Sequence, residues 1–268
     1  SAVTSTSRVC HRTRTRGRRF VDRARMDRTL ASVEFSHPAL RGASPVTVRQ
    51  NLDAPSAEEE GTARWVWPGA TATARWLCDR DRGRWLENKH VLELGSGTGL
   101  LGLVAARLGA ASVTLTDLPS ELDLLRANVA LNSIAASSPT RVEPLVWGDE
   151  TGMLQLIDRA RLPSGFDVVL CCDLVYRNGD EHQRALARTM RRALGDAAFP
   201  GAENATSEKK EKKTESSRVA VVAYQFRENV LGDSPFFDEV DILFADPRRH
   251  DTEDEDLWLF EYWPKTER

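Results

Sequence analysis

The sequence predicts an α/β fold, because short apolar runs typical of buried strands alternate with segments of helical periodicity along most of its length. The clearest unit is an apolar run at residues 91–94, then glycines at 95, 97 and 99, then an apolar helical stretch at 100–108. A strand, a tight turn and a helix in this order form the repeating unit of a parallel sheet. We therefore expect a mostly parallel sheet with helices on both faces and a ligand crevice at the carboxyl ends of its strands.

The other elements follow from the same patterns, taken along the chain. Helices are expected at residues 70–79, 99–108, 120–132, 151–160 and 180–194. Strands are expected at residues 91–94, 112–117, 141–147, 166–172 and 218–226. A helix-like segment begins at residue 236, and residues 241–244 and 257–263 are expected to close the sheet as an antiparallel pair.

Length and composition indicate one domain with polar additions. The chain has 268 residues, and we place the domain at residues 33–264, with a disordered polar loop at 195–217. Four cysteines, two of them adjacent in an apolar run, lack metal-ligand spacing and are typical of thiols in a reducing compartment. No apolar run approaches the ~18 residues of a membrane-spanning helix. We therefore expect a cytoplasmic protein with no metal site and no membrane partner.

Residues 1–32 form a basic leader that we expect to be disordered. Residues 1–28 hold nine arginines against two aspartates, so they carry +7 and the rest of the chain carries −10 of the overall −3. The leader lacks an apolar stretch, which excludes a secretory signal peptide. An organelle transit peptide, an arm that touches nucleic acid, and an extension upstream of a true start at Met26 all stay open.

Two ligands compete for the glycine turn. Residues 97–102 fit G-x-G-x-x-G, which holds the pyrophosphate of a dinucleotide at a helix N-terminus. Glu93, however, places a carboxylate before the turn, where it would repel a pyrophosphate but attract the ammonium and sulfonium of S-adenosylmethionine (SAM). A turn that binds nothing is the third alternative, although it leaves three glycines without a purpose.

Asp117 ends the second expected strand, 20 residues after Gly97. A carboxylate at this point can accept hydrogen bonds from both hydroxyls of a ribose, whichever nucleoside ligand is bound. The alternative is that Asp117 only caps the helix that follows Pro119.

The downstream motifs favour the methyl donor. In order and spacing the chain resembles the class I, seven-strand methyltransferases, and more closely methyltransferase family 16, whose members methylate lysines of chaperones, chaperone-like ATPases and elongation factors. The resemblance covers residues 33–264 and rests on VWPGA at 66–70, ELGSGTG at 93–99, TLTD at 114–117, VWG at 146–148 and DLVY at 173–176. VTVRQ at 46–50 resembles the N-terminal strand of that family. The resemblance implies a Rossmann-like sheet of seven strands with an antiparallel C-terminal strand.

Several donor-binding roles follow. Gly95, Ser96 and Gly97 are expected to line the methionine and ribose portion of SAM through their backbone, and Trp147 offers a flat surface for adenine. The resemblance adds Trp67 and Cys172 as donor contacts. Trp67 could instead pack in the core, and packing is the role that we expect for the remaining tryptophans: Trp65, Trp76, Trp85, Trp258 and Trp263.

Asp173 and Tyr176 are the candidate catalytic residues. An acid and a phenol three positions apart at a strand end can point into one pocket, where they would hold, deprotonate and align the amine of a lysine. The alternative is that Asp173 caps a turn and Tyr176 packs. A family landmark is altered at Pro68-Gly69, where many relatives carry other small or acidic residues.

The sequence therefore predicts a monomeric, SAM-dependent protein-lysine methyltransferase that releases S-adenosylhomocysteine. The negative charge of the domain opposes a phosphate-backbone partner. Methylation of a small molecule or a nucleic acid stays open, as does a SAM-binding pseudoenzyme that acts as an interaction module.

Overall fold

The computed structural model describes residues 30–42, 44–51, 62–132, 138–176, 179–195, 218–226, 233–252 and 254–265. Most of the expected leader, residues 1–29, and most of the expected polar loop, residues 196–217, lie outside the described residues. The first described strand begins at Ser32.

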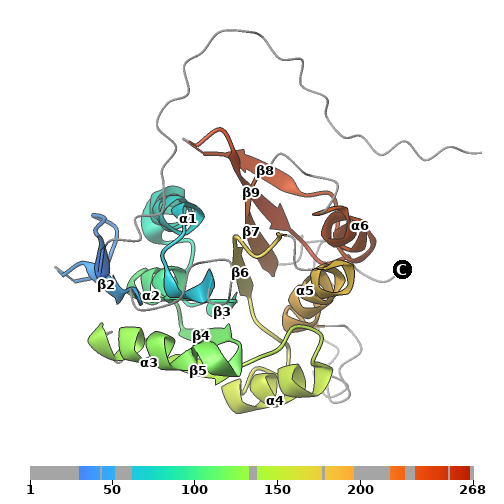
Figure 1. Ribbon diagram of the computed structural model, residues 1–268, viewed down its shortest axis with the longest axis horizontal. Helices are drawn as coiled ribbons and strands as arrows, with labels where there is room; N and C mark the ends of the chain where they lie inside the picture. The colour runs from blue at the N-terminus through green and yellow to red at the C-terminus, as the bar shows by residue number, and fades with distance from the viewer. Residues whose placement is uncertain are drawn as a thin grey trace, which may run out of the picture.

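A seven-stranded sheet forms the centre of the molecule, in the order β5-β4-β3-β6-β7-β9-β8 (Figure 1). The strands are β3 His90–Leu94, β4 Ser112–Asp117, β5 Thr140–Pro144, β6 Val168–Cys172, β7 Val219–Gln225, β8 Arg248–Asp251 and β9 Leu257–Tyr262. β5, β4, β3, β6 and β7 are parallel to one another, and β9 runs antiparallel to its two neighbours, β7 and β8. The predicted sheet class is confirmed. The strand order reverses between β3 and β6, which is where open α/β sheets bind ligands.

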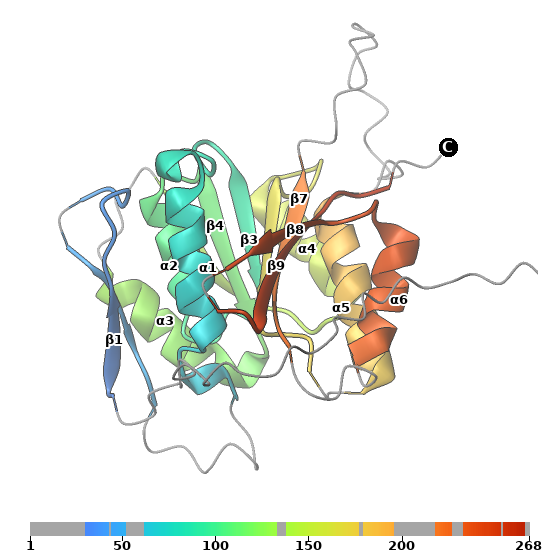
Figure 2. The same ribbon diagram turned by 90° about the horizontal axis from the view of Figure 1, so that it is seen from above.

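Two layers of helices cover the sheet, and Figure 2 shows the strands between them. One layer contains α1 Pro68–Asp79, α2 Leu100–Arg107 and α3 Leu122–Leu131, whose apolar residues share one core with the sheet. The other contains α4 Glu150–Ala160, α5 Asp180–Ala193 and α6 Ser234–Leu243, which pack on the opposite core. Short 3-10 helices complete the fold: η1 Thr62–Arg64, η2 Arg80–Gly83 and η3 Pro119–Glu121. Among the described helices, none has the length and apolarity to span a bilayer.

The N-terminal strand that we expected at 46–50 belongs to a separate hairpin. β1 Ser32–Phe35 and β2 Val46–Arg49 pair antiparallel with each other, outside the layer of α2 and α3 (Figure 2). Asn128 of α3 fixes this hairpin, because its side chain accepts from the Arg49 N–H at 2.8 Å and donates to the Arg49 and Thr98 carbonyls at 3.1 and 2.9 Å. The hairpin is thereby tied to the glycine turn.

The expectation for the closing strands was wrong at one end. Residues 241–243 complete α6, and β9 pairs antiparallel with β7 and β8 instead. Phe236, Val240 and Phe244 are all buried and recur every fourth residue, which is helical spacing. The helical segment expected from residue 236 was therefore ended too early. β8 is an edge strand of charged, largely exposed residues and therefore lacks the apolar alternation that predicts a strand. The third strand also ends at Pro144, so Trp147 lies in the turn beyond it.

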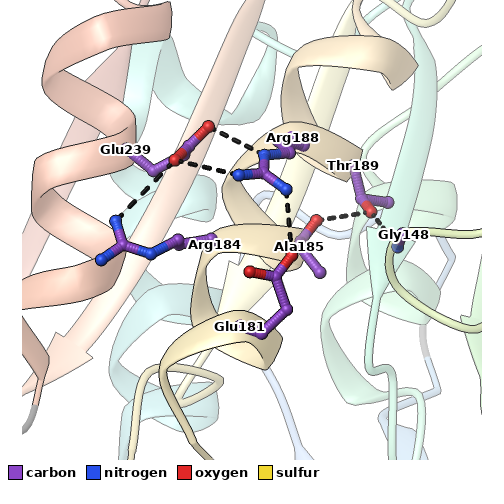
Figure 3. A network of polar contacts seen from close by, with 7 residues as sticks. All are labelled: Gly148, Glu181, Arg184, Ala185, Arg188, Thr189 and Glu239. Carbon is purple, nitrogen blue, oxygen red and sulfur yellow. Dashed lines mark hydrogen bonds and ion pairs between the residues drawn. The ribbon is translucent and has the colours of Figure 1, made fainter.

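Polar contacts on α5 hold two neighbouring segments in place (Figure 3). Arg188 pairs with Glu239 of α6 at 2.9 Å and with Glu181 at 3.0 Å. On the other side of the helix, the Thr189 hydroxyl accepts a hydrogen bond from the Gly148 N–H at 2.9 Å. α5 therefore positions both α6 and the turn that carries Trp147.

Candidate functional site

A cavity of about 860 Å³ lies at the carboxyl ends of β3, β4 and β6. Its volume is typical of a small-molecule site. All of the predicted site residues contribute to its wall: Trp67, Glu93, Gly95, Ser96, Gly97, Asp117, Trp147, Cys172, Asp173 and Tyr176. Residues separated by more than 100 positions in the sequence thus meet around one space.

Glu93, Gly95, Ser96, Gly97 and Asp117 make up one side of the cavity, the glycine-turn half. Gly95 and Gly97 have φ of +55° and +53°, which side chains other than glycine rarely adopt. A Cβ on Gly97 would also lie only 3.0 Å from the Ala63 carbonyl oxygen. Glycine is therefore required at Gly97 by both the backbone conformation and the packing of η1 against the turn.

Asp117 is bound to the turn itself. Its Oδ2 accepts from the Gly97 N–H at 2.7 Å, and its Oδ1 accepts from the Leu118 N–H at 2.8 Å. Burial raises the pKa of Asp117, and these two hydrogen bonds act in the opposite direction. The carboxylate is thus fixed by backbone donors in the wall of the cavity.

Glu93 is buried deeper and is held in a similar way. Its Oε2 accepts from the Gly102 N–H of α2 at 2.9 Å. Burial raises the pKa of Glu93 to about 8, and nearby Asp117 adds to the effect. A cation bound beside Glu93 would favour the ionised form and lower this pKa.

Cys172, Asp173, Tyr176 and Asp233 make up another part of the wall, the β6 half. Asp173 has a φ of +55°, a strained value for a residue with a side chain and one that recurs at functional sites. The Asp173 N–H donates to the Ala223 carbonyl of β7 at 3.0 Å. Burial raises the pKa of the neighbouring Cys172 thiol well above its ordinary value, so this thiol is an apolar wall rather than a nucleophile.

The Asp173 carboxylate packs against the first turn of α1. A Cβ placed on Gly69 would lie 2.3 Å from Asp173 Oδ2, so glycine at this position permits the approach. A helix N-terminus stabilises negative charge, which suits an ionised aspartate. The altered landmark at Pro68-Gly69 therefore bears directly on the candidate catalytic acid.

The aromatic residues line the cavity from two directions. Trp67 precedes α1 and occupies its N-cap position. A Cβ added to Gly95 would lie 3.3 Å from the Trp147 ring. Trp147 also contacts the His182 ring, with centroids 4.6 Å apart. Burial lowers the pKa of His182, which keeps the ring neutral and suited to stacking. Trp65, expected to pack in the core or at its rim, is buried and also forms part of the wall.

Sequence reasoning missed several wall residues that no motif carries. Arg64 of η1 and Glu121 of η3 form an ion pair of 3.6 Å across part of the wall. His182 of α5 and Asp233, at the start of α6, also line the cavity. Only the tertiary fold brings these segments to the site, so spacing in the sequence gave no signal for them.

The cavity is strongly acidic. In the described part of the chain, five carboxylates line it against the single guanidinium of Arg64: Glu93, Asp117, Glu121, Asp173 and Asp233. Such a wall attracts cations and repels phosphates. No group of histidine, cysteine or acidic side chains among the described residues is arranged to hold a metal ion.

The sequence model for the family described as lysine methyltransferase matches residues 47–240. The chain belongs to this family. The resemblance inferred from the ordered motifs is therefore confirmed, and the match includes every predicted site residue.

Named relatives are similar over part of their length. EEF1A lysine methyltransferase 3 of Xenopus tropicalis is 36% identical over 118 residues, covering 43% of this chain and 46% of that protein. Protein N-lysine methyltransferase METTL21A of Danio rerio is 37% identical over 118 residues, covering 43% and 49%. This lysine methyltransferase family chain thus spans about half the length of the curated relatives it matches.

A solved structure supports the fold alone. The PH0226 protein from Pyrococcus horikoshii OT3 aligns with a TM-score of 0.51 and 12% identity, over 72% of this chain and 88% of that one.

Proposed function

We propose that this protein is a SAM-dependent methyltransferase that transfers a methyl group to the side-chain amine of a lysine in a protein substrate. The observation that carries the proposal is the acidic cavity, in which five carboxylates face one guanidinium, within a chain of the lysine methyltransferase family. Both the donor and the acceptor of this reaction bring positive charge to the site. A wall of this sign suits them both.

The glycine-turn half fits SAM. Gly95 and Gly97, both at positive φ, place their backbone in the cavity wall where it can contact the ligand, and Glu93 supplies negative charge for the cationic methionine end. Each Asp117 oxygen that accepts a backbone N–H retains a second lone pair for a ribose hydroxyl. When bound, SAM supplies an electrophilic methyl group on a positively charged sulfur.

The remaining donor contacts come from the rest of the wall. Trp147 covers the adenine face, Ser96 lines the ribose side through its backbone, and Trp67 and Cys172 close the space around the sulfonium. A dinucleotide fits less well, because its pyrophosphate would lie among the carboxylates of the same turn.

The β6 half is the acceptor end. A lysine ammonium has a pKa near 10.4 in water and must lose a proton before its nitrogen can attack. Asp173 holds the ammonium and accepts that proton, while the Tyr176 phenol aligns the nitrogen along the line of displacement. The positive φ of Asp173 and the close approach allowed by Gly69 keep the carboxylate in this position.

We further propose that the protein acts as a monomer in the cytoplasm and that its substrate is a translation factor. Two relatives are named for the methylation of EEF1A, which makes elongation factor 1A the first protein to test. Chaperones and chaperone-like ATPases are the next classes, as the family resemblance implies.

Labelled SAM tests the proposal directly. The purified protein is incubated with unmethylated elongation factor 1A, and separately with cell lysate, and each labelled product is digested and its methylated residue located by mass spectrometry. Label on a lysine of a protein is the expected result. Label confined to RNA or to small molecules would show that the acceptor is not a protein. SAM binding without any transfer would indicate an interaction module.

A further inference from the structure

The cavity contains a buried carboxylate that the proposed mechanism has not used. Asp233 lines the same wall as Asp173 and Tyr176 and is only 2% exposed. It occupies the N-cap position of α6, where an aspartate side chain ordinarily accepts a backbone N–H of the first turn. Here the side chain makes no such capping bond. Its orientation must therefore have another cause.

That cause is the phenol of Tyr224. The Tyr224 hydroxyl donates to Asp233 Oδ2 at 2.7 Å, and both residues are buried. Tyr224 follows Ala223 on β7, and the Ala223 carbonyl accepts the Asp173 N–H at 3.0 Å. Two consecutive residues of β7 thus hold both cavity acids: Ala223 binds the backbone of Asp173, and Tyr224 binds the side chain of Asp233.

Gln183 of α5 joins the same region. Its Nε2 donates to the Tyr176 carbonyl at 2.9 Å, and its Oε1 accepts from the Phe236 N–H of α6 at 3.4 Å. The segment that carries Tyr176 and the helix that begins after Asp233 are therefore tied to one buried side chain. Asp173, Tyr176, Tyr224 and Asp233 are thus connected through β7, Gln183 and α6, and together they form the acceptor end.

The charge of Asp233 is handled differently from that of the other cavity acids. Glu93 and Asp117 accept backbone N–H groups, and Glu121 is paired with Arg64. Among the residues that the structure describes, the neutral Tyr224 phenol is the one hydrogen-bond partner of the Asp233 carboxylate. A buried carboxylate without a cationic partner favours a bound cation strongly.

We propose that Asp233 binds the ammonium of the acceptor, together with Asp173, and so selects a cationic amine over a neutral side chain. This inference rests on the proposed lysine methylation and assigns its substrate recognition. Asp173 accepts the proton, while Asp233 supplies the fixed negative charge that brings the ammonium into the site. Tyr224 is a positioning residue that acts through Asp233.

Binding of two small probes tests the assignment without turnover. Nα-acetyl-lysine methylamide and its neutral counterpart, Nα-acetyl-norleucine methylamide, are titrated by NMR into the full-length protein saturated with S-adenosylhomocysteine. We expect the parent to prefer the lysine probe and Asp233→Asn to lose about tenfold of that preference, with unchanged affinity for S-adenosylhomocysteine. An unchanged preference in the folded Asp233→Asn protein would overturn the assignment.

Tyr224→Phe provides a second variant, because it keeps the ring that packs in the core and removes only the hydroxyl. We expect about a threefold loss of the lysine preference. The KM for the protein substrate should rise, with a nearly unchanged kcat. A fall in kcat alone, with the preference intact, would also overturn the assignment. Lysine preference without any methyl transfer would instead contradict the proposed function and leave the cation site standing.

Discussion

The two halves of the cavity are built in different ways. In the glycine-turn half, both acids are held by backbone N–H groups no more than 20 positions away: Glu93 by Gly102, and Asp117 by Gly97 and Leu118. In the β6 half, the two acids are 60 positions apart and depend on packing, on the Tyr224 phenol and on the missing Cβ of Gly69. The first half is a property of a local motif, whereas the second is a property of the tertiary fold.

This difference separates the effects of substitutions. A change in the glycine-turn half should alter the affinity for the donor, because the groups proposed to hold the ribose and the methionine end of SAM belong to this half. A change at Asp173, Tyr176 or Asp233 of the β6 half should alter acceptor binding or turnover and leave donor affinity nearly intact. A variant that moved both quantities together would show the halves to be coupled.

The largest effect is expected from Asp173→Asn. This substitution keeps the size of the side chain but removes the charge proposed to hold and deprotonate the amine, so turnover should fall by about 100-fold or more. SAM affinity, measured by titration calorimetry, should change by less than about threefold. Unaffected single-turnover transfer would make Asp173 a purely structural residue of its strained turn.

Asp117→Ala should have the next largest effect, on SAM affinity rather than on turnover. It removes the charge-assisted hydrogen bonds proposed to the ribose and releases the N–H groups of Gly97 and Leu118, so SAM binding should weaken by about 1.5–3 kcal/mol. The kcat at saturating SAM should fall much less. Calorimetry on a variant with a native-like melting curve decides the point, and tighter binding of NAD than of SAM by the parent would overturn the donor assignment.

The same difference explains how far the sequence could predict the site. Glu93, Gly95, Ser96 and Gly97 lie within five positions, and Asp117 ends the next strand along the chain, so the sequence pattern indicated both the turn and the acids. Asp173 and Tyr176 could be predicted because they follow a strand directly. Asp233, His182 and the Arg64–Glu121 pair could not, because each comes from an element whose position relative to the cavity is set only by tertiary packing.

The fold shows the same limit. The parallel strands are buried on both faces and form apolar runs that periodicity detects. β8 gains its place only by pairing with β9, and its exposed charged residues carry no strand pattern of their own. The end of α6 was misassigned for a related reason, since a short apolar run fits a helix or a strand until its neighbours are known.

A smaller effect is expected from pH, again in the glycine-turn half. Burial raises the pKa of Glu93 from its ordinary value of 4.5 to about 8, so the ligand-free protein carries a proton there at neutral pH. A cationic donor favours the carboxylate, so SAM binding should release a proton and strengthen by up to about tenfold per pH unit between roughly pH 6 and 8.

Glu93→Gln is the matched control, because the amide oxygen can still accept the Gly102 N–H. The variant should bind SAM more weakly and lose most of the pH dependence. The raised pKa also means that the parent loses stability as pH rises from 4.5 to about 8, a loss that Glu93→Gln should not show. Equal pH dependence of SAM binding in both proteins would place the titrating group elsewhere.

The smallest effect, and the sharpest test of the β6 half, comes from Gly69→Ala. Alanine is the better helix former by about 0.5–1 kcal/mol, so on propensity alone the substitution in α1 should stabilise the protein. Its Cβ, however, would lie 2.3 Å from Asp173 Oδ2, and the carboxylate must move away from the helix N-terminus. We expect turnover to fall by no more than about tenfold, with SAM affinity unchanged and a net loss of about 1 kcal/mol of stability.

The double variant with Asp173→Ala isolates the cause, because it removes the atoms that the new methyl group meets. In that background Gly69→Ala should become stabilising by the propensity difference, as measured by denaturant unfolding. Strict additivity of the two substitutions would show that Gly69 does not set the position of Asp173, and that the strained backbone of Asp173 alone determines where its carboxylate lies.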